Sequence, residues 1–261
     1  MNKAASAHAP QSTRVLGAIQ NLIALHQGGH LKGEIMPEDS NPGLSKSSRE
    51  NAHYFTLPMT LNYQRNSYTL WESALKAYHD PETSFLFQPE KVVQTSFNDL
   101  QTALVKHKVA LQKNKHTEIW QRVCETLHTH YDNNVINLFA KHDYDIGHIL
   151  QDVQIDNKKS YPYLSGQKIA NYWLYVMTSY TDLPFKNKQA LSVAPDTHVI
   201  QATIRLGLIA AGNDHNLLRT DVAKAWADLL HGTDLVPIDI HTPLWLWSRN
   251  NFLPDPFEAR S

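Results

Sequence analysis

Two residues of opposite charge each stand at the predicted start of a helix. Lys168 follows a turn that Pro162 and Gly166 punctuate, and apolar residues recur at helical spacing from Lys168 onward. Asp196 has the residue type and position of an N-cap, ahead of a second helix that is predicted to run to Gly207. A helix N-terminus carries partial positive charge, which favours the neutral form of a nearby amine. A neutral lysine is a nucleophile able to form a Schiff base, and a neighbouring carboxylate can orient that amine or stabilise a developing cation.

Both residues also have a purely structural interpretation. Most aspartates in such a position only cap the helix, because the carboxylate accepts hydrogen bonds from the first N–H groups. Most lysines at a helix start simply extend into solvent. Taken alone, Lys168 and Asp196 are therefore compatible with catalysis and with ordinary helix ends.

The composition is typical of a soluble globular protein. Of the 261 residues, 42% are hydrophobic and 19% are charged, which suits one large domain or two small ones. No apolar run reaches membrane-spanning length, and the N-terminal residues lack the apolar core of a signal peptide. Cys124 is the only cysteine, which excludes an internal disulfide and favours a reducing, cytoplasmic compartment.

The net charge of −1 argues mildly against nucleic-acid binding, for which a basic patch is expected. Two basic runs are local candidates for such a patch. One is Lys158 and Lys159, beside the turn that precedes Lys168. The other run comprises Lys106, His107, Lys108, Lys113, Lys115 and His116. Either run is explained equally well as a solvated helix face.

Apolar residues recur at helical rather than strand spacing along the chain, which predicts an all-α fold. Residues 1–12 are polar and expected to be disordered, and residues 32–50, rich in Ser, Pro, Gly and charge, predict a loop. Further helices are predicted at 13–26, 54–78 (a helix pair), 89–93, 97–105, 116–130, 135–139 and 221–230. Three parts are predicted: an N-terminal helix and loop (1–50), a helical subdomain (51–87 plus 180–261) and a second helical subdomain (88–179).

Several histidines stand near one another or near aspartates. The richest group is His142, Asp143, Asp145 and His148, and smaller pairs occur at 26/30 and 128/130. None of them has a recognised metal-ligand spacing, and no cysteine accompanies them. Surface histidines are the preferred interpretation, so no metal and no other cofactor is expected.

The two helix starts resemble a known family. Gly166-Gln167-Lys168-Ile169-Ala170-Asn171, followed by Pro195-Asp196-Thr197-His198-Val199-Ile200, is similar to the helix-hairpin-helix DNA glycosylases of the endonuclease III and 8-oxoguanine glycosylase superfamily. The resemblance implies that Lys168 is the nucleophile and that Asp196 lies at the mouth of the same pocket. It also implies that hairpin amides around Ser165 and Gly166 hold a DNA phosphate, although Leu164 stands where a first glycine is common. An iron–sulfur cluster of the endonuclease III type needs four thiolates, which one cysteine cannot supply.

Two further stretches resemble the archaeal-type 8-oxoguanine DNA glycosylases (AGOG) within that superfamily. Residues 61–67, followed by Trp71, are similar to an early helix in which a Gln, here Gln64, reaches the edge of the flipped base. Residues 237–245 are similar to the C-terminal tail, whose Trp stacks on the lesion opposite an aromatic residue one turn after the Lys. These positions are Trp245 and Tyr172, and the acidic residue expected four before Trp245 is replaced by His241, with Asp239 two residues earlier.

The resemblance covers roughly residues 52–247 and implies a bifunctional DNA glycosylase/AP lyase, without an iron–sulfur cluster, that excises an oxidised purine such as 8-oxoguanine in base-excision repair. The expected partner is double-stranded DNA containing the damaged base, bound by a monomer without a membrane, in the nucleoid region of the cytoplasm. Two alternatives remain open. One is a related glycosylase for another lesion, such as an oxidised pyrimidine, and the other is a non-catalytic helix-hairpin-helix DNA-binding protein.

Overall fold

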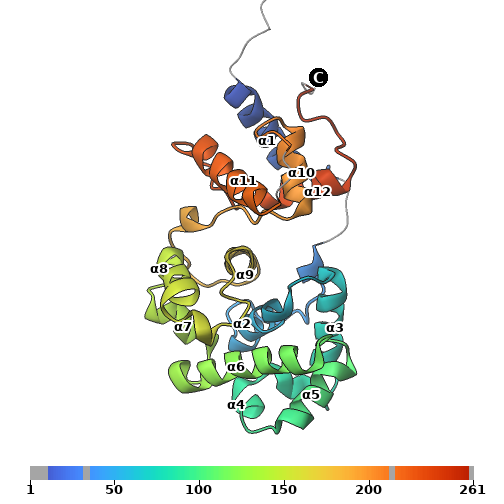
Figure 1. Ribbon diagram of the computed structural model, residues 1–261, viewed down its shortest axis with the longest axis vertical. Coiled ribbons are helices and arrows are strands. Elements are labelled where there is room, and N and C mark those ends of the chain that lie inside the picture. Colours follow the sequence, from blue (N-terminus) through green and yellow to red (C-terminus); the bar gives the residue numbers. More distant parts are fainter. Residues whose placement is uncertain (1–10, 32–35, 212–214, 259–261) are drawn as a thin grey trace, which may run out of the picture. The chain divides into compact units, whose positions relative to one another are not determined.

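The protein is all-α, as predicted from the sequence (Figure 1). The structure is a computed structural model and describes residues 11–31, 36–211 and 215–258. Within these ranges the helices are joined by turns and by one isolated bridge between Asp145 and Lys186, and no extended strand forms. The α-helices are α1 (Gln11–Gln27), α2 (Arg49–Thr56), α3 (Ser67–His79), α4 (Pro89–Val92), α5 (Phe97–Lys106), α6 (Lys113–Tyr131), α7 (Val135–Lys141), α8 (Ile146–Gln151), α9 (Gln167–Tyr180), α10 (Thr197–Arg205), α11 (His215–Leu230) and α12 (His241–Arg249).

The chain forms two compact units. The smaller unit joins residues 1–34 to residues 191–261, and the larger unit is residues 35–190. This division differs from the predicted subdomains because α2 packs on α7 and α9, so residues 51–87 belong with the segment that follows them. The N-terminal helix, in turn, packs on α11 and α12 (Figure 1).

The smaller unit has an apolar core between α1, α10, α11 and α12. Trp226 and Trp247 are almost fully buried and belong to this core. The indole of Trp226 donates to Thr203 Oγ1 at 2.9 Å, and that of Trp247 donates to the Pro254 carbonyl at 2.9 Å. Their polar atoms are therefore paired inside the core, so burial of the rings costs no hydrogen bond.

The larger unit is built around aromatic side chains. Tyr54 of α2 lies within 5.7 Å, centroid to centroid, of the rings of Trp71, Tyr78 and Phe87. Trp173 of α9 is fully buried and donates to Thr56 Oγ1 at 3.0 Å, which joins α9 to α2. Aromatic packing of this kind fixes the position of α9, the helix that carries Lys168.

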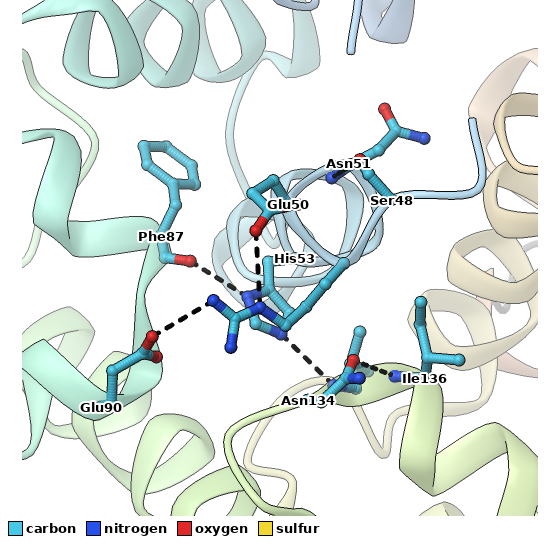
Figure 2. Close-up of polar contacts among 10 residues, drawn as sticks. Ser48, Glu50, Asn51, His53, Phe87, Glu90, Asn134 and Ile136 are labelled. Atoms are coloured by element: carbon cyan, nitrogen blue, oxygen red, sulfur yellow. Dashed lines mark hydrogen bonds and ion pairs between the residues drawn. The ribbon is translucent and has the colours of Figure 1, made fainter. Parts of the chain in front are cut away.

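A buried histidine joins three elements of the same unit (Figure 2). His53 Nδ1 donates to the Phe87 carbonyl at 3.1 Å, and the Val135 amide donates to Nε2 at 3.3 Å. A carbonyl can only accept and an amide can only donate, so the ring is neutral with its proton on Nδ1. Burial accordingly lowers the pKa of His53 to about 4. Beside it, Arg49 is paired with Glu90 at 3.3 Å.

Most predicted helices are confirmed with small shifts of their ends. The helix predicted at 13–26 is α1, and Ser96 caps α5 by accepting from the Asp99 amide at 3.2 Å. Residues 1–10 of the segment predicted to be disordered lie outside the described residues, as do 32–35 of the predicted loop. Two features were not predicted: α8, continued by a π-helical turn at Asp152–Asp156, and α12 in the tail. None of the helices in the described parts of the chain is long and apolar enough to cross a bilayer.

Candidate active site

The turn before α9 is a tight hairpin held by its own backbone. The Ser165 amide donates to the Tyr161 carbonyl at 2.8 Å, and the Gly166 amide donates to the Tyr163 carbonyl at 3.0 Å. Tyr163 has a left-handed φ of 61°, and a Cβ on Gly166 would lie 3.2 Å from the Tyr163 carbonyl oxygen. The amides of Ser165 and Gly166, the two predicted phosphate contacts, are therefore engaged inside the turn. They shape the hairpin that leads into the helix.

Lys168 is the second residue of α9, as predicted. Gly166 is the N-cap, and its carbonyl accepts the first intrahelical bond, from the Ala170 amide, at 2.8 Å. Lys168 is exposed, whereas Ile169 and Ala170 are buried. The first-turn N–H groups of Gln167 and Ile169 have no acceptor within the helix, because an α-helix leaves these groups unsatisfied. The lysine thus stands at an exposed, electropositive helix end.

A buried polar network anchors the start of the hairpin. Tyr161 donates from its hydroxyl to that of Tyr131 at 3.0 Å, and Tyr131 donates to Asp152 Oδ2 at 3.3 Å. The same carboxylate is bound by His142 Nε2 at 2.9 Å and by the Asn157 amide. Burial alone would raise the pKa of Asp152, but the hydrogen bonds from Asn157 and His142 outweigh it and lower the pKa. The network holds the π-helical turn against the hairpin.

Two of the histidines considered as metal ligands have side-chain partners: His142 contacts Asp152, and His128 Nδ1 lies 2.8 Å from Asn133 Oδ1. Asp145 caps α8: its carboxylate accepts a hydrogen bond from the backbone amide of His148 at 3.1 Å. In the described residues, no group of three or more His, Cys, Asp or Glu side chains is arranged to hold a metal ion.

Tyr172 lies one helical turn after Lys168 and is partly buried. Its hydroxyl donates to Glu38 Oε2 at 3.1 Å. The other oxygen of Glu38 accepts from the indole of Trp71 at 3.0 Å. The Glu38 carboxyl therefore bridges α3 and α9 beside the aromatic residue that was predicted to stack on the damaged base.

Glu38 is almost completely buried, with 1% of its surface exposed. Burial raises its pKa to about 7, although the hydrogen bonds from Tyr172 and Trp71 oppose that shift. Burial, followed by the nearby charge of Glu38, also raises the pKa of Tyr172. Sequence reasoning missed Glu38 because it lies in the predicted loop, and no periodicity or motif marked it.

The segment around Glu38 is tied to the helices on both sides. Tyr180, at the end of α9, donates to Asp39 Oδ1 at 2.8 Å. Tyr54 of α2 donates to the Ser40 carbonyl at 2.9 Å. These bonds hold residues 36–41 against α2 and α9, so the position of Glu38 is defined by contacts rather than by its own short helix.

Gln64 lies in a turn, not in the predicted early helix. The 3₁₀-helix Pro58–Leu61 ends before it, and α3 begins after it, at Ser67. Gln64 is exposed and has a left-handed φ of 49°. Its neighbour Arg65 donates to the Val109 carbonyl at 2.6 Å, and this long-range bond holds the turn away from helical geometry. Gln64 is thereby presented at the surface of the larger unit.

Asp196 caps α10, as predicted, by accepting from the Val199 amide at 2.9 Å. In the same unit, the His198 ring meets Trp245 edge-on, 5.7 Å between centroids. The guanidinium of Arg249 lies 5.1 Å from the centre of the Trp245 ring. Trp245 is partly buried, and its ring lies between His198 of α10 and Arg249 of its own helix, α12.

Two residues predicted to stand near Trp245 differ in their surroundings. His241 is the first residue of α12, one turn before Trp245, and is 3% exposed. Asp239 lies in the preceding turn and is exposed. At the position where an acidic residue was expected, this chain therefore has a buried histidine, and the Asp239 side chain is exposed.

The predicted site residues fall into two sets, one in each compact unit. The larger unit holds Gln64, Ser165, Gly166, Lys168 and Tyr172, together with the newly identified Glu38. The smaller unit holds Asp196, Asp239, His241 and Trp245. Within each unit the helices bring members together, as Lys168 and Tyr172 share a face of α9 and as His241 and Trp245 share one of α12.

A surface depression of about 650 Å³ lies elsewhere on the larger unit, over α5 and the preceding 3₁₀-helix Ser84–Phe87. None of the predicted site residues lines it. No family model matches the chain, and no curated protein matches its sequence.

Proposed function

We propose that the protein is a bifunctional DNA glycosylase/AP lyase that excises an oxidised purine, 8-oxoguanine, from double-stranded DNA. The single observation that carries the proposal is the setting of Lys168. The residue is exposed in the first turn of the helix that follows a tight hairpin, with the Tyr172 ring one turn further on. An exposed lysine at an electropositive helix end, one turn before an aromatic residue, has the chemistry of a Schiff-base nucleophile beside a base-stacking group.

The reaction begins when the neutral amine of Lys168 attacks C1′ of the damaged nucleotide. The new N–C1′ bond forms as the glycosidic bond breaks, and the base leaves with the bonding electrons and takes up a proton. Opening of the sugar gives a Schiff base, which acidifies the C2′ proton and allows β-elimination of the 3′ phosphate. The role assigned to Asp196 is to stabilise positive charge on the sugar or to move a proton.

Base recognition is assigned to Gln64, Tyr172, Trp245, His241 and Asp239. A Gln amide both donates and accepts, which suits the edge of a base. Stacking on aromatic rings is worth about 1–3 kcal/mol per base and helps to offset the cost of extruding the nucleotide. His241 is buried where the 8-oxoguanine glycosylases that the sequence resembles carry a carboxylate. We expect this exchange to have the largest effect on lesion preference.

Phosphate contacts are assigned to the hairpin and to the first turn of α9. The amides of Ser165 and Gly166 hold the turn, so the N–H groups of Gln167 and Ile169 are the donors directed ahead of the helix. Such contacts position DNA without reading its sequence. The proposed enzyme has a helix-hairpin-helix glycosylase core and needs no iron–sulfur cluster. It acts as a monomer on the DNA of the nucleoid.

Borohydride trapping on a duplex that contains 8-oxoguanine tests the proposal. The reductant fixes the Schiff base, so the wild-type protein should give a covalent protein–DNA adduct and Lys168→Gln should give none. Lys91→Gln, which changes an exposed lysine of α4, is the matched control and should be trapped as the wild type is. Trapping that persists in Lys168→Gln would refute the assignment of the nucleophile.

A panel of lesion duplexes separates the open alternatives. If the adduct forms only with an oxidised pyrimidine, that lesion, and not 8-oxoguanine, is the substrate. Salt-sensitive DNA binding without adduct or strand cleavage, unchanged in Lys168→Gln, would identify a non-catalytic binding protein and overturn the enzymatic proposal.

A further inference from the structure

An exposed aromatic pair stands next to the hairpin of the larger unit. Tyr63, in the turn before α3, stacks on Tyr163 at the hairpin, with 5.0 Å between ring centroids and 28° between ring planes. Tyr63 is 46% exposed, whereas most large apolar and aromatic side chains of this unit are buried. One face of the Tyr63 ring is covered by Tyr163, and much of the remaining ring surface is open to solvent.

A lysine from a third segment completes the pair. Lys115, in the first turn of α6, places Nζ 5.0 Å from the centre of the Tyr163 ring. Cation–π contact at such a distance holds the ammonium group against the ring and leaves it available to an anion. The Lys115 ammonium group donates a hydrogen bond to the Tyr163 hydroxyl, which raises the pKa of Lys115, so the charge is retained at neutral pH.

The turn that carries Tyr63 is also held against a basic segment. Arg65 donates to the Val109 carbonyl at 2.6 Å and to the Lys108 carbonyl at 3.2 Å. Burial, followed by the charges of Arg65 and Lys115, lowers the pKa of His116. Three segments with no acidic residue thus meet at this surface: 61–71, 106–117 and 157–181.

Not every cation of the basic run contributes. Lys106 is paired with Asp80 at 2.7 Å and with Glu82 at 2.6 Å, and His107 also contacts Asp80. Lys108 is exposed, as is Lys115. The first acidic residue after the segment 106–117 is Glu118, one turn after Lys115 on α6. The positive surface is therefore local, within a chain whose net charge is −1.

We propose that Tyr63 is a stacking platform for an unpaired base of a DNA strand. The phosphates of that strand contact Lys108 and Lys115. A duplex does not satisfy this surface, because bases inside a helix have both faces covered by their neighbours. Aromatic rings combined with a basic surface are the usual means of holding single strands. The platform does not depend on the reaction proposed above, since binding requires neither a lesion nor bond breakage.

Fluorescence anisotropy with a labelled twelve-nucleotide oligothymidylate tests the platform. Tyr63→Ala should weaken binding by about 5- to 150-fold, the equivalent of one base stacked on one ring. Tyr63→Phe keeps the ring and should bind as the wild type does. Tyr63 is exposed, so circular dichroism and thermal unfolding should be unchanged in both variants. Equal affinity of Tyr63→Ala and wild type would overturn the proposal.

Salt titration gives a second readout. Lys115→Gln removes one phosphate contact and should reduce the slope of log affinity against log salt concentration by about 0.7. Lys91→Gln of α4 should leave the slope unchanged. A blank duplex bound more tightly than the single strand, with no effect of Tyr63→Ala, would instead identify a surface for duplex phosphates. Loss of trapping in the glycosylase test would not alter any of these outcomes, so the two proposals fail separately.

Discussion

Two buried titratable side chains in the larger unit, His53 and Glu38, respond to burial in opposite ways. Both are about equally hidden, at 2% and 1% exposure, and each has two hydrogen-bond partners in the protein. For both groups burial disfavours the charged form, so the pKa of His53 falls to about 4 and that of Glu38 rises to about 7.

The partners distinguish a structural anchor from a responsive site. His53 is bound by one acceptor and one donor of the backbone, which match its neutral form completely (Figure 2). Glu38 is bound by two donors, Trp71 and Tyr172, which match its ionised form, while burial favours the protonated form. Its charge state is therefore balanced near neutral pH, beside the helix face that carries Lys168. Complete pairing fixes His53, whereas conflicting demands leave Glu38 sensitive to its surroundings.

The largest expected effect is on stability when His53 is replaced. His53→Leu keeps a similar volume but leaves the Phe87 carbonyl and the Val135 amide buried without partners. The cost should be about 2–6 kcal/mol in the free energy of unfolding, because each of the two unpaired buried groups costs about 1–3 kcal/mol. Urea unfolding at pH 7.5 measures the loss. A loss below about 1 kcal/mol would show that the pairing of His53 is not what holds these elements together.

The second prediction uses the pH dependence of stability. The folded pKa of Glu38 lies above its unfolded value, so its favourable contribution is complete below pH 4.5 and is lost as pH rises through about 7. The folded pKa of His53 lies below its unfolded value, so its contribution is present above pH 6.5 and is lost as pH falls through about 4. The two slopes oppose each other in the same window, and the wild-type profile is flattened.

Glu38→Gln should remove one of these slopes. The free energy of unfolding of the variant should then rise with pH between 4.5 and 7, by up to about 3 kcal/mol relative to the wild-type profile, since one pKa unit corresponds to about 1.4 kcal/mol. Urea unfolding at pH 5 and pH 8 gives the difference between variant and wild type at each pH. Glu72→Gln changes an exposed carboxylate of the same helix as Trp71 and is the control. An unchanged difference between the two pH values would contradict the buried, proton-binding state of Glu38.

Local patterns in the sequence were enough to predict much of the fold. Periodicity located α1, α5 and α9, and the capping residue Asp196 located α10, because helix ends depend on a few adjacent residues. The first-turn position of Lys168 followed from the same local signals. These parts could be predicted because neighbours in the sequence determine them.

Long-range contacts determine the features that were missed. The position of Glu38 is fixed by hydrogen bonds from Trp71 and Tyr172, which are separated from it by 33 and 134 positions in the sequence, and no local pattern reveals them. Gln64 lies in a turn because Arg65 is bound to Val109, although its own sequence fits a helix. The grouping of residues 51–87 with the following helices likewise depends on packing of α2 against α9. Pairwise contacts between distant segments therefore decided the part of the candidate site that sequence reasoning could not supply.

The smallest expected effect isolates one of the two bonds to Glu38. Tyr172→Phe keeps the ring beside Lys168 but removes the donor that favours the ionised carboxylate, so the pKa of Glu38 should rise by about one unit, as expected for a hydrogen bond worth about 1–1.5 kcal/mol. A carbon-13 NMR titration of the labelled carboxyl would measure the shift directly. Tyr175→Phe, which alters a ring next to Tyr172 on α9, is the matched control and should leave the titration in place. A lower pKa in Tyr172→Phe would mean that water reaches Glu38 once the hydroxyl is gone, and burial would then depend on that hydroxyl rather than on the surrounding rings.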